Sequence, residues 1–262
     1  MSKRKLKMGV CVVCPSSGRN VPVEWAMAIA TLAYPMGMNH SWFISKADPK
    51  NPQMTRDIQR DTLVERALAL GSKYILMLDD DTVPPAHAVN SLWYVLEQNP
   101  KAAIAAGIYC SKEDNPTPLV FQEPGEGAFY QWTLGDVFKC KGIAAGCMMI
   151  RLSVFQNLSK PWFKDTFSTP QHKEVIGDIE VDLVGDSGTD DLYFCRKVID
   201  AGWDILAHGG VLPMHIDSET GKQYTIPEDS YPVVTYMAKR EAALKLGNAP
   251  PTNLDKHEVT KK

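Results

Sequence analysis

The sequence predicts an α/β protein with a twisted, mostly parallel central sheet flanked by helices, and two observations carry that prediction. Short apolar runs rich in β-branched residues alternate with amphipathic segments about four times over residues 1–110, as parallel strands and their right-handed crossover helices do. Hydrophobic residues make up 44% of the 262 residues and charged residues 23%. This balance is ordinary for a globular chain and excludes a disordered one.

The first half of the chain supplies the repeating strands and helices. Each strand is expected from a short apolar run, and the helices are bounded by prolines near their first turns or by a glycine or proline beyond their last. The expected strands are 8–14, 41–44, 73–78 and 102–109, and the expected helices are 22–33, 57–70 and 84–98.

The second half is less regular, because its apolar runs are shorter and are separated by Gly and Pro turns. The expected strands are 119–122, 129–133, 137–139, 143–151 and, as the last one, 204–207, and the expected helices are 152–158, 189–201 and 233–246. Residues 247–262 contain two consecutive prolines and are expected to form a flexible tail. Since no linker rich in Pro, Gly or Ser separates the halves, we expect a single domain over residues 1–246.

Charge and hydropathy exclude two classes of protein. The net charge of −3 excludes a dedicated, strongly basic nucleic-acid binder. The long stretch 26–45 is free of charged residues but is interrupted by Pro35 and Gly37, so we expect no membrane span. Residues 3–5 are basic and precede an apolar run, as in a weak signal peptide, and we expect a basic leader followed by the first buried strand.

The six cysteines are expected to be reduced core thiols of a cytoplasmic protein, or of one in the host cytoplasm if the source is a virus. Cys11 and Cys14 have the spacing of a zinc or redox pair, but no second Cys/His pair at zinc spacing accompanies them. In a strand these two side chains would face opposite sides of the sheet, which favours core packing.

Three consecutive carboxylates, Asp79, Asp80 and Asp81, follow the strongest predicted strand. The carboxyl ends of strands in such a sheet face the ligand crevice. Adjacent carboxylates repel one another, and a divalent cation that also binds phosphate oxygens would relieve the repulsion. The alternative is a solvated acidic turn in which Asp81 caps the following helix.

A second acidic pair, Asp190 and Asp191, opens a predicted helix, and His215 lies beyond the last predicted strand. The helix dipole alone favours carboxylates at such a place, but they can also accept a proton or bind a sugar hydroxyl. His215 alone is consistent with an ordinary loop residue or with a metal ligand.

The order of these groups resembles the GT-A glycosyltransferases, specifically the small family-2-like enzymes of bacteria and their viruses that use nucleotide sugars. The resemblance covers about residues 8 to 216. The segments that carry it are the helix 60–68 leading into 76–81, the Gly-containing strand 142–150, the stretch 161–163, the stretch 189–195 (Thr-Asp-Asp-Leu-Tyr-Phe-Cys), and Gly202-Trp203 followed by a strand and His215.

The resemblance implies a nucleotide-binding half over 1–110, an acceptor and catalytic half over 111–246, and a nucleoside diphosphate sugar, first of all a UDP-sugar, as donor. It also implies Mn²⁺ or Mg²⁺. In the resemblance, the DxD acids Asp79 and Asp81 bind the metal together with His215. Asp191 is the implied catalytic base, and Asp190 is implied to contact sugar hydroxyls. The residues implied to bind the nucleotide or its sugar are Pro15, Ser16, Ser17, Arg60, Asp79, Asp80 and Gly146.

Two positions depart from the family pattern. Asp190 stands where the family usually has the longer Glu, which shortens its reach by one methylene. Asp61, after Arg60, stands where Asn is frequent, and a carboxylate there would repel a diphosphate unless it faces elsewhere.

Two other functions stay open. A nucleotidyltransferase would favour a Gly-rich basic loop after the first strand, where residues 15–19 offer one Gly and one Arg; a catalytically inactive nucleotide-sugar-binding module is the other. The acceptor is open among a DNA base, a glycan, a protein and a small molecule, with a hydroxymethylated pyrimidine of DNA expected if the source is a bacteriophage. Tyr130, Trp132 and Trp162 would form an aromatic platform for it or pack in the core. The oligomeric state is not predicted.

Overall fold

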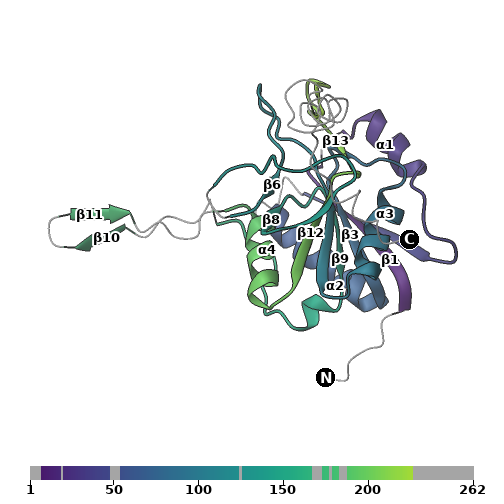
Figure 1. Ribbon diagram of the computed structural model, residues 1–262, viewed down its shortest axis with the longest axis horizontal. Helices are drawn as coiled ribbons and strands as arrows, with labels where there is room; N and C mark the ends of the chain where they lie inside the picture. The colour runs from purple at the N-terminus through teal and green to yellow at the C-terminus, as the bar shows by residue number, and fades with distance from the viewer. Residues whose placement is uncertain are drawn as a thin grey trace, which may run out of the picture.

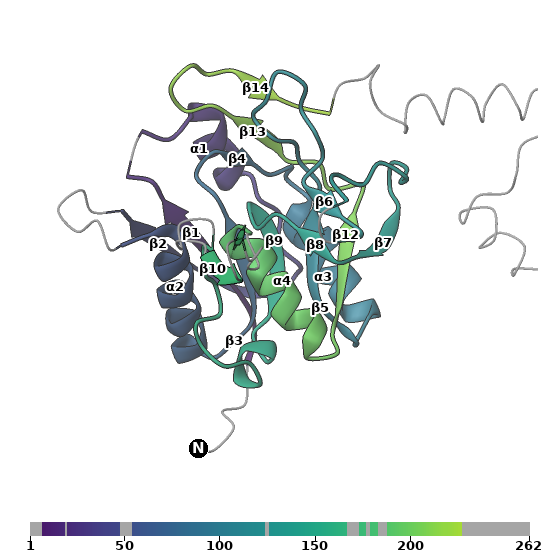
Figure 2. The same ribbon diagram turned by 90° about the vertical axis from the view of Figure 1, so that its left-hand side faces the viewer.

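The computed structural model describes residues 7–18, 20–47, 54–123, 126–166, 173–176, 179–182 and 188–226. Their centre is a seven-stranded sheet in the order β2-β1-β3-β9-β5-β12-β7, with helices packed against both faces (Figures 1 and 2). Its strands are β2 (Asn39–Lys46), β1 (Lys7–Ser16), β3 (Ser72–Leu78), β9 (Cys147–Arg151), β5 (Ala102–Gly107), β12 (Asp204–His208) and β7 (Val137–Cys140).

The direction of the strands confirms the predicted α/β class. Strands β2, β1 and β3 are parallel, and β12 is parallel to β5. Strand β9 lies antiparallel between β3 and β5, so these two also run the same way. Strand β7 closes the edge antiparallel to β12. The sheet is therefore mixed but mostly parallel, and the carboxyl ends of β1, β3, β5 and β12 share one edge.

Alternation along the strands divides the core into two layers. On one face, Cys11 and Val13 lie in the cluster covered by α2 (Arg56–Leu70) and α4 (Asp190–Asp200). On the other face, Val12 and Cys14 lie in the cluster covered by α1 (Val23–Ala30) and α3 (Ala88–Gln98). Cys11 and Cys14 thus face opposite sides as expected, and all six cysteines are buried thiols.

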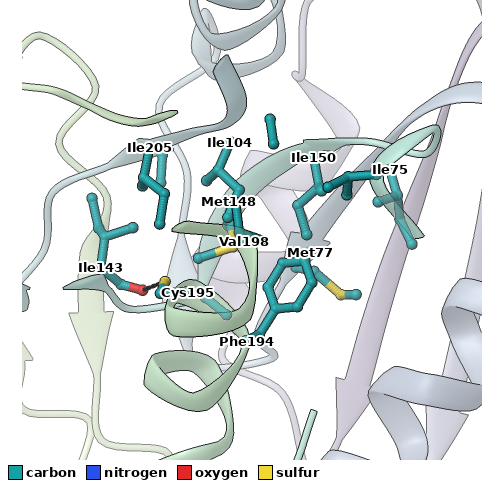
Figure 3. Packing of buried hydrophobic residues seen from close by; sticks show 14 of the residues in the cluster. Ile75, Met77, Ile104, Ile143, Met148, Ile150, Phe194, Cys195, Val198 and Ile205 are labelled. Carbon is teal, nitrogen blue, oxygen red and sulfur yellow. Dashed lines mark hydrogen bonds between the residues drawn. The ribbon is translucent and has the colours of Figure 1, made fainter. Parts of the chain in front are cut away.

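Helix α4 is anchored by apolar side chains, and this anchoring positions the acids at its first turn. Phe194 and Val198 are fully buried and lie over Met77, Met148 and the isoleucines of the sheet (Figure 3). Cys195 donates from its Sγ to the carbonyl oxygen of Ile143 over 3.6 Å. Each such buried side chain contributes roughly 1.5–3 kcal/mol, which holds the N-terminus of α4 against the sheet.

Most predicted elements of the first half lie close to their expected bounds. Helix α2 ends at Gly71, whose φ of 76° is the left-handed conformation that glycine adopts without strain. Helix α3 begins at Ala88 rather than at Pro84, because a short strand, β4 (Thr82–Val83), follows the acidic triplet first.

The second half differs more from the prediction. Residues 129–133 are irregular rather than a strand, and the predicted strand 143–151 is divided into β8 (Gly142–Ile143) and β9 by the turn at 144–146. The predicted helix 152–158 is a 3₁₀ turn, η1 (Val154–Gln156). Strand β6 (Val120–Phe121) pairs with β8, and β10 (Lys173–Ile176) forms a hairpin with β11 (Ile179–Asp182).

The expectation that 204–207 is the last strand was wrong. Strands β13 (Met214–Ile216) and β14 (Gln223–Tyr224) follow it, and β13 pairs antiparallel with both β14 and β4. Figure 2 shows these three short strands together at the top of the view, beside α1. Strands of two or three residues are too short to show a periodic pattern in the sequence. β13 is a strand because its backbone pairs with β4.

Some expectations lie outside the part of the chain that the structure describes: the basic residues 3–5, the helix 233–246 and the tail 247–262. Among the residues that are described, no helix combines the length and the apolar character needed to cross a membrane.

Candidate active site

The three acids that follow β3 are held at the carboxyl edge of the sheet by backbone contacts from two other segments. The amide of Asp79 donates to the carbonyl oxygen of Gly146 over 3.1 Å, and the amide of Ile216 donates to the carbonyl oxygen of Asp81 over 2.8 Å. The indole Nε1 of Trp25, on α1, donates to the carbonyl oxygen of Asp79 over 2.8 Å. The triplet is therefore anchored to the β8–β9 turn, to β13 and to α1.

Asp79 is bound by a buried arginine. Nη2 of Arg60 donates to both carboxylate oxygens of Asp79 over 3.0 and 3.1 Å, and Nη1 donates to Asp190 over 2.6 Å. Arg60 is only 1% exposed. Burial lowers the pKa of Arg60, but the charges of Asp79 and Asp190 outweigh burial and raise it above its ordinary value. This guanidinium is a permanent cation between two carboxylates.

Asp80 joins the end of β3 to the end of β1. Its Oδ2 accepts hydrogen bonds from Ser16 Oγ over 2.9 Å, from the Ser17 amide over 2.9 Å and from Ser17 Oγ over 3.1 Å. Asp80 and Ser16 are buried, whereas Ser17 is exposed. Pro15, the third residue predicted at the nucleotide, is buried inside β1, in register with Ser45.

Asp81 faces two nitrogen atoms, one on each carboxylate oxygen. His215 Nε2 lies 3.4 Å from Oδ1, and Lys112 Nζ lies 2.6 Å from Oδ2. Burial alone would raise the pKa of Asp81, but the hydrogen bonds and charges of His215 and Lys112 outweigh burial and lower it below its ordinary value. Asp81 is therefore an anion in the folded protein.

The ring of His215 is oriented by its other nitrogen. Nδ1 lies 2.8 Å from the carbonyl oxygen of Cys110, and because a carbonyl only accepts, Nδ1 carries a proton. Tyr109 holds the ring edge-on, with ring centroids 5.2 Å apart. Such an arrangement turns Nε2 toward Asp81, as the outer hydrogen bond does for a metal-binding histidine.

Asp191 lies at the first turn of α4, facing the β8–β9 turn. Its Oδ2 accepts from the Ala145 amide over 3.2 Å, and its Oδ1 accepts from the Leu192 amide over 2.9 Å. The hydroxyl of Thr189 also bonds to Oδ1. Asp190 turns inward and is buried, whereas Asp191 is half-buried. Neighbours in sequence thus have different surroundings.

Gly146 leaves room for protein atoms. A Cβ at this position would lie 2.4 Å from Tyr109 Oη and 2.7 Å from Thr82 Oγ1. The Gly146 amide donates to Tyr109 Oη over 2.9 Å. The missing side chain therefore accommodates the buried Tyr109 hydroxyl, which is a different reason for a glycine from the close approach to a sugar that the sequence predicts.

Asp61 faces away from the acidic edge. Its carboxylate accepts from the amides of Trp162 and Phe163 over 3.2 and 3.0 Å. The expected repulsion of a diphosphate is thereby removed. Of the two alternatives for the aromatic residues, Trp132 and Trp162 follow core packing, since they are 3% and 5% exposed and lie in the core cluster.

The structure adds residues that sequence reasoning missed. Lys112 contacts Asp81, the Tyr109 hydroxyl contacts Gly146, and Arg56 is an exposed arginine one helical turn before Arg60. The charge of Asp79 raises the pKa of Arg56. The predicted helix begins at residue 57 and leaves out Arg56, so the four-residue spacing from Arg56 to Arg60, which places both on one face of α2, was not used.

The three predicted metal ligands are not equivalent. Asp81 and His215 are neighbours, whereas Asp79 is bonded to Arg60. Within the ranges that the structure describes, no three His, Cys, Asp or Glu side chains are arranged to hold a metal by themselves. A magnesium-type site uses one or two carboxylates together with substrate phosphates. Asp81 supplies such a carboxylate, and the oriented Nε2 of His215 lies beside it as a further donor, of a kind that transition metals such as Mn²⁺ also accept.

The order and directions of the strands give an α/β fold that matches GT-A-like structures. Comparison with solved structures finds it in the crystal structure of A197 from STIV, with a TM-score of 0.57, 14% identity, and coverage of 84% of this chain and 95% of that chain. What the two chains share at this identity is the fold.

Two other solved structures match this chain with lower TM-scores. The crystal structure of S. aureus TarS has a TM-score of 0.48 and 11% identity, over 95% of this chain and 41% of that chain. The structure of CMP:2-keto-3-deoxy-manno-octonic acid synthetase complexed with CTP has a TM-score of 0.42 and 14% identity, over 77% of this chain and 89% of that chain. No protein-family model and no curated protein matches the sequence.

Proposed function

We propose that this chain is a glycosyltransferase that moves a sugar from a nucleoside diphosphate sugar, first of all a UDP-sugar, to a hydroxyl acceptor. The observation that carries the proposal is the set of contacts at one edge of the sheet: Asp81 against His215, and Asp79 joined through Arg60 to Asp190. These residues come from four separate segments, and their common position is suited to gripping a phosphorylated sugar.

The donor's nucleoside would lie at the ends of β1 and β3. Asp80 fixes the Ser16 and Ser17 segment through two hydroxyls and an amide, and Ser17 stands exposed where a ribose or base would lie. Arg60 keeps Asp79 and Asp190 side by side, so that Asp79 faces the ribose and sugar while Asp190 binds sugar hydroxyls. Arg60 is in this proposal a positioning residue, because both of its Nη atoms are bonded to carboxylates.

Asp81 and His215 would hold Mn²⁺ or Mg²⁺ together with the donor's phosphates. When bound, such an ion neutralises the negative charge that develops on the departing diphosphate. His215 contributes an Nε2 that its Cys110 hydrogen bond orients toward Asp81. Asp81 contributes a carboxylate that stays ionised.

Asp191 is the candidate general base. Its carboxylate takes the proton of the acceptor hydroxyl as that oxygen bonds to the anomeric carbon, and the bond between that carbon and the diphosphate oxygen breaks, releasing the nucleoside diphosphate. The amides of Ala145 and Leu192 fix the orientation of this carboxylate. The acceptor stays open among a DNA base, a glycan, a protein and a small molecule.

The test is nucleotide release from a panel of nucleotide sugars with Mn²⁺ or Mg²⁺. We expect turnover of at least one donor and a loss of about a hundredfold or more in Asp81→Asn. Asp204→Asn is the matched control, since Asp204 also pairs with a lysine and its side chain is 21% exposed against 22% for Asp81.

Three results would contradict the proposal. Failure to turn over any donor counts against it directly. Release of pyrophosphate from a nucleoside triphosphate would indicate a nucleotidyltransferase instead. Tight binding of a donor with no turnover on any acceptor would indicate an inactive binding module.

A further inference from the structure

Lys112 is a cation at the acidic edge that has no role in the sugar transfer proposed above. It lies on the loop after β5, and its Nζ is 2.6 Å from Oδ2 of Asp81. The opposite oxygen of the same carboxylate faces His215. Both oxygens of Asp81 therefore face nitrogen atoms.

The partner of Asp81 differs in kind from the partners of the other two acids. Asp79 is bound by Arg60, whose side chain is 2% exposed and fixed on α2, and Asp80 is bound by hydroxyl groups and an amide. The Lys112 side chain is 26% exposed. Its ammonium is a single charge on a flexible stem, so it can leave Asp81 without any rearrangement of the core.

The backbone beneath Lys112 is anchored. The Ser111 amide donates to the carbonyl oxygen of Thr117 over 2.9 Å, the Thr117 amide donates to Ser111 Oγ over 3.1 Å, and Cys110 forms a β-bridge with Pro118. Cys110 is also the residue whose carbonyl oxygen orients His215. Movement of the ammonium is therefore expected to involve the side chain, while the backbone stays beside the site.

We propose that Lys112 is the internal counter-ion of Asp81, that a divalent cation must displace it, and that the displaced ammonium then pairs with the diphosphate of the bound nucleotide. This inference rests on the proposed function.

The reason for displacement is electrostatic. A divalent ion bound to Asp81 and an ammonium 2.6 Å from one of its oxygens would repel each other strongly at that separation. When the divalent ion binds alone, the ion pair between Lys112 and Asp81 is broken and nothing replaces it. When the ion binds together with a diphosphate, Lys112 gains a new anionic partner. Lys112 would thus weaken metal binding in the absence of nucleotide and strengthen nucleotide binding in the presence of metal.

The experiment measures Mn²⁺ affinity from the electron paramagnetic resonance signal of free Mn²⁺, with the purified full chain and no nucleotide. We expect Lys112→Met to bind Mn²⁺ about two- to fivefold more tightly than the wild type, as suits the loss of a partly exposed competing ion pair. Lys112→Arg, which keeps the charge, should stay near the wild type. Asp81→Asn reports whether the ion binds at this carboxylate.

Lys73→Met is the matched control. Lys73 lies at the other end of β3, and its Nζ is 2.7 Å from Glu97, with side chains 32% and 28% exposed. This variant removes the same charge from a pair of similar exposure and should leave Mn²⁺ affinity unchanged.

The second measurement is UDP affinity by calorimetry at saturating Mn²⁺, where Lys112→Met should bind UDP about two- to fivefold more weakly. If wild type binds Mn²⁺ and UDP through Asp81 but Lys112→Met changes neither affinity, the role of Lys112 is refuted and the proposed function stands. If no variant binds Mn²⁺ or a nucleotide, both proposals fall together.

Discussion

Arg60 Nη1 lies 2.6 Å from Asp190 Oδ2, although 130 residues separate the two in sequence. The same guanidinium holds Asp79, so one buried cation fixes the distance between the acid after β3 and the acid that opens α4. Asp190, one methylene shorter than a glutamate, is thus in direct contact with an arginine. Integrity of the acidic edge depends on this arginine.

Arg60→Met should be strongly destabilising. It leaves two carboxylates, one of them buried, without their cation, and breaking a buried pair typically costs about 3–5 kcal/mol. Arg66→Met, on the exposed side of the same helix, should lower the free energy of unfolding by less than about 1 kcal/mol. Urea denaturation of both variants checks this, and equal effects would show that Arg60 stabilises only as an ordinary helix residue.

Asp191→Asn should separate catalysis from binding. The side-chain oxygen of the asparagine can still accept a hydrogen bond from the backbone N–H of Ala145 or Leu192. The asparagine side chain cannot take up a proton from the acceptor. We therefore expect the rate of sugar transfer to fall about 10²- to 10⁴-fold, while the affinity for the nucleoside diphosphate changes little. Full transfer activity in Asp191→Asn would assign the base elsewhere.

Asp61→Ala should destabilise the protein by about 2 kcal/mol. Two backbone amides, those of Trp162 and Phe163, lose their acceptor, and such unsatisfied groups cost about 1–3 kcal/mol. Asp61→Asn keeps one acceptor oxygen and should lose less. Thermal unfolding checks the order, and an alanine variant as stable as the asparagine variant would contradict it.

Gly146→Ala should be destabilising because its Cβ would meet the Tyr109 hydroxyl 2.4 Å away. Overpacking of this kind costs about 1–3 kcal/mol. In the double variant with Tyr109→Phe, the nearest atom is removed, so the cost of the alanine should be smaller than in wild type. A double-mutant cycle of unfolding free energies measures this coupling, and strict additivity would rule it out.

His208 should make stability pH-dependent. Burial, followed by the neighbouring His87, lowers the pKa of His208, and the neutral ring accepts a hydrogen bond from the Gly210 amide at Nδ1 over 3.0 Å. In the unfolded chain His208 has a pKa of about 6.5 and binds a proton more readily than in the folded protein. Its contribution to the free energy of unfolding is therefore complete above that pH and is lost as the pH falls below it.

The matching variant is His208→Asn, which offers an amide oxygen to the Gly210 amide but does not titrate. Its unfolding free energy, measured by urea denaturation between pH 8 and pH 5, should fall less than that of the wild type. Parallel pH profiles for the two proteins would refute the assignment to His208.

The sequence by itself determined the repeating strands and helices of the first half, the α/β class and the position of Asp79–Asp81 directly after a buried strand. These follow from local periodicity and from residues such as Gly71 that end a helix, which act over a few residues. It also singled out Asp190, Asp191 and His215, which the structure brings to the same edge as the acidic triplet or to the turn beside it.

Only the tertiary structure decided which group partners each acid. Arg60 is bonded to Asp79 and Asp190, Lys112 to Asp81, and His215 lies on a strand that exists through its pairing with β4. A lone lysine in a polar loop and a three-residue strand have no periodic pattern, so their roles depend on what the fold places beside them. Side-chain pairing across the sheet is a long-range property, and packing and register fix it.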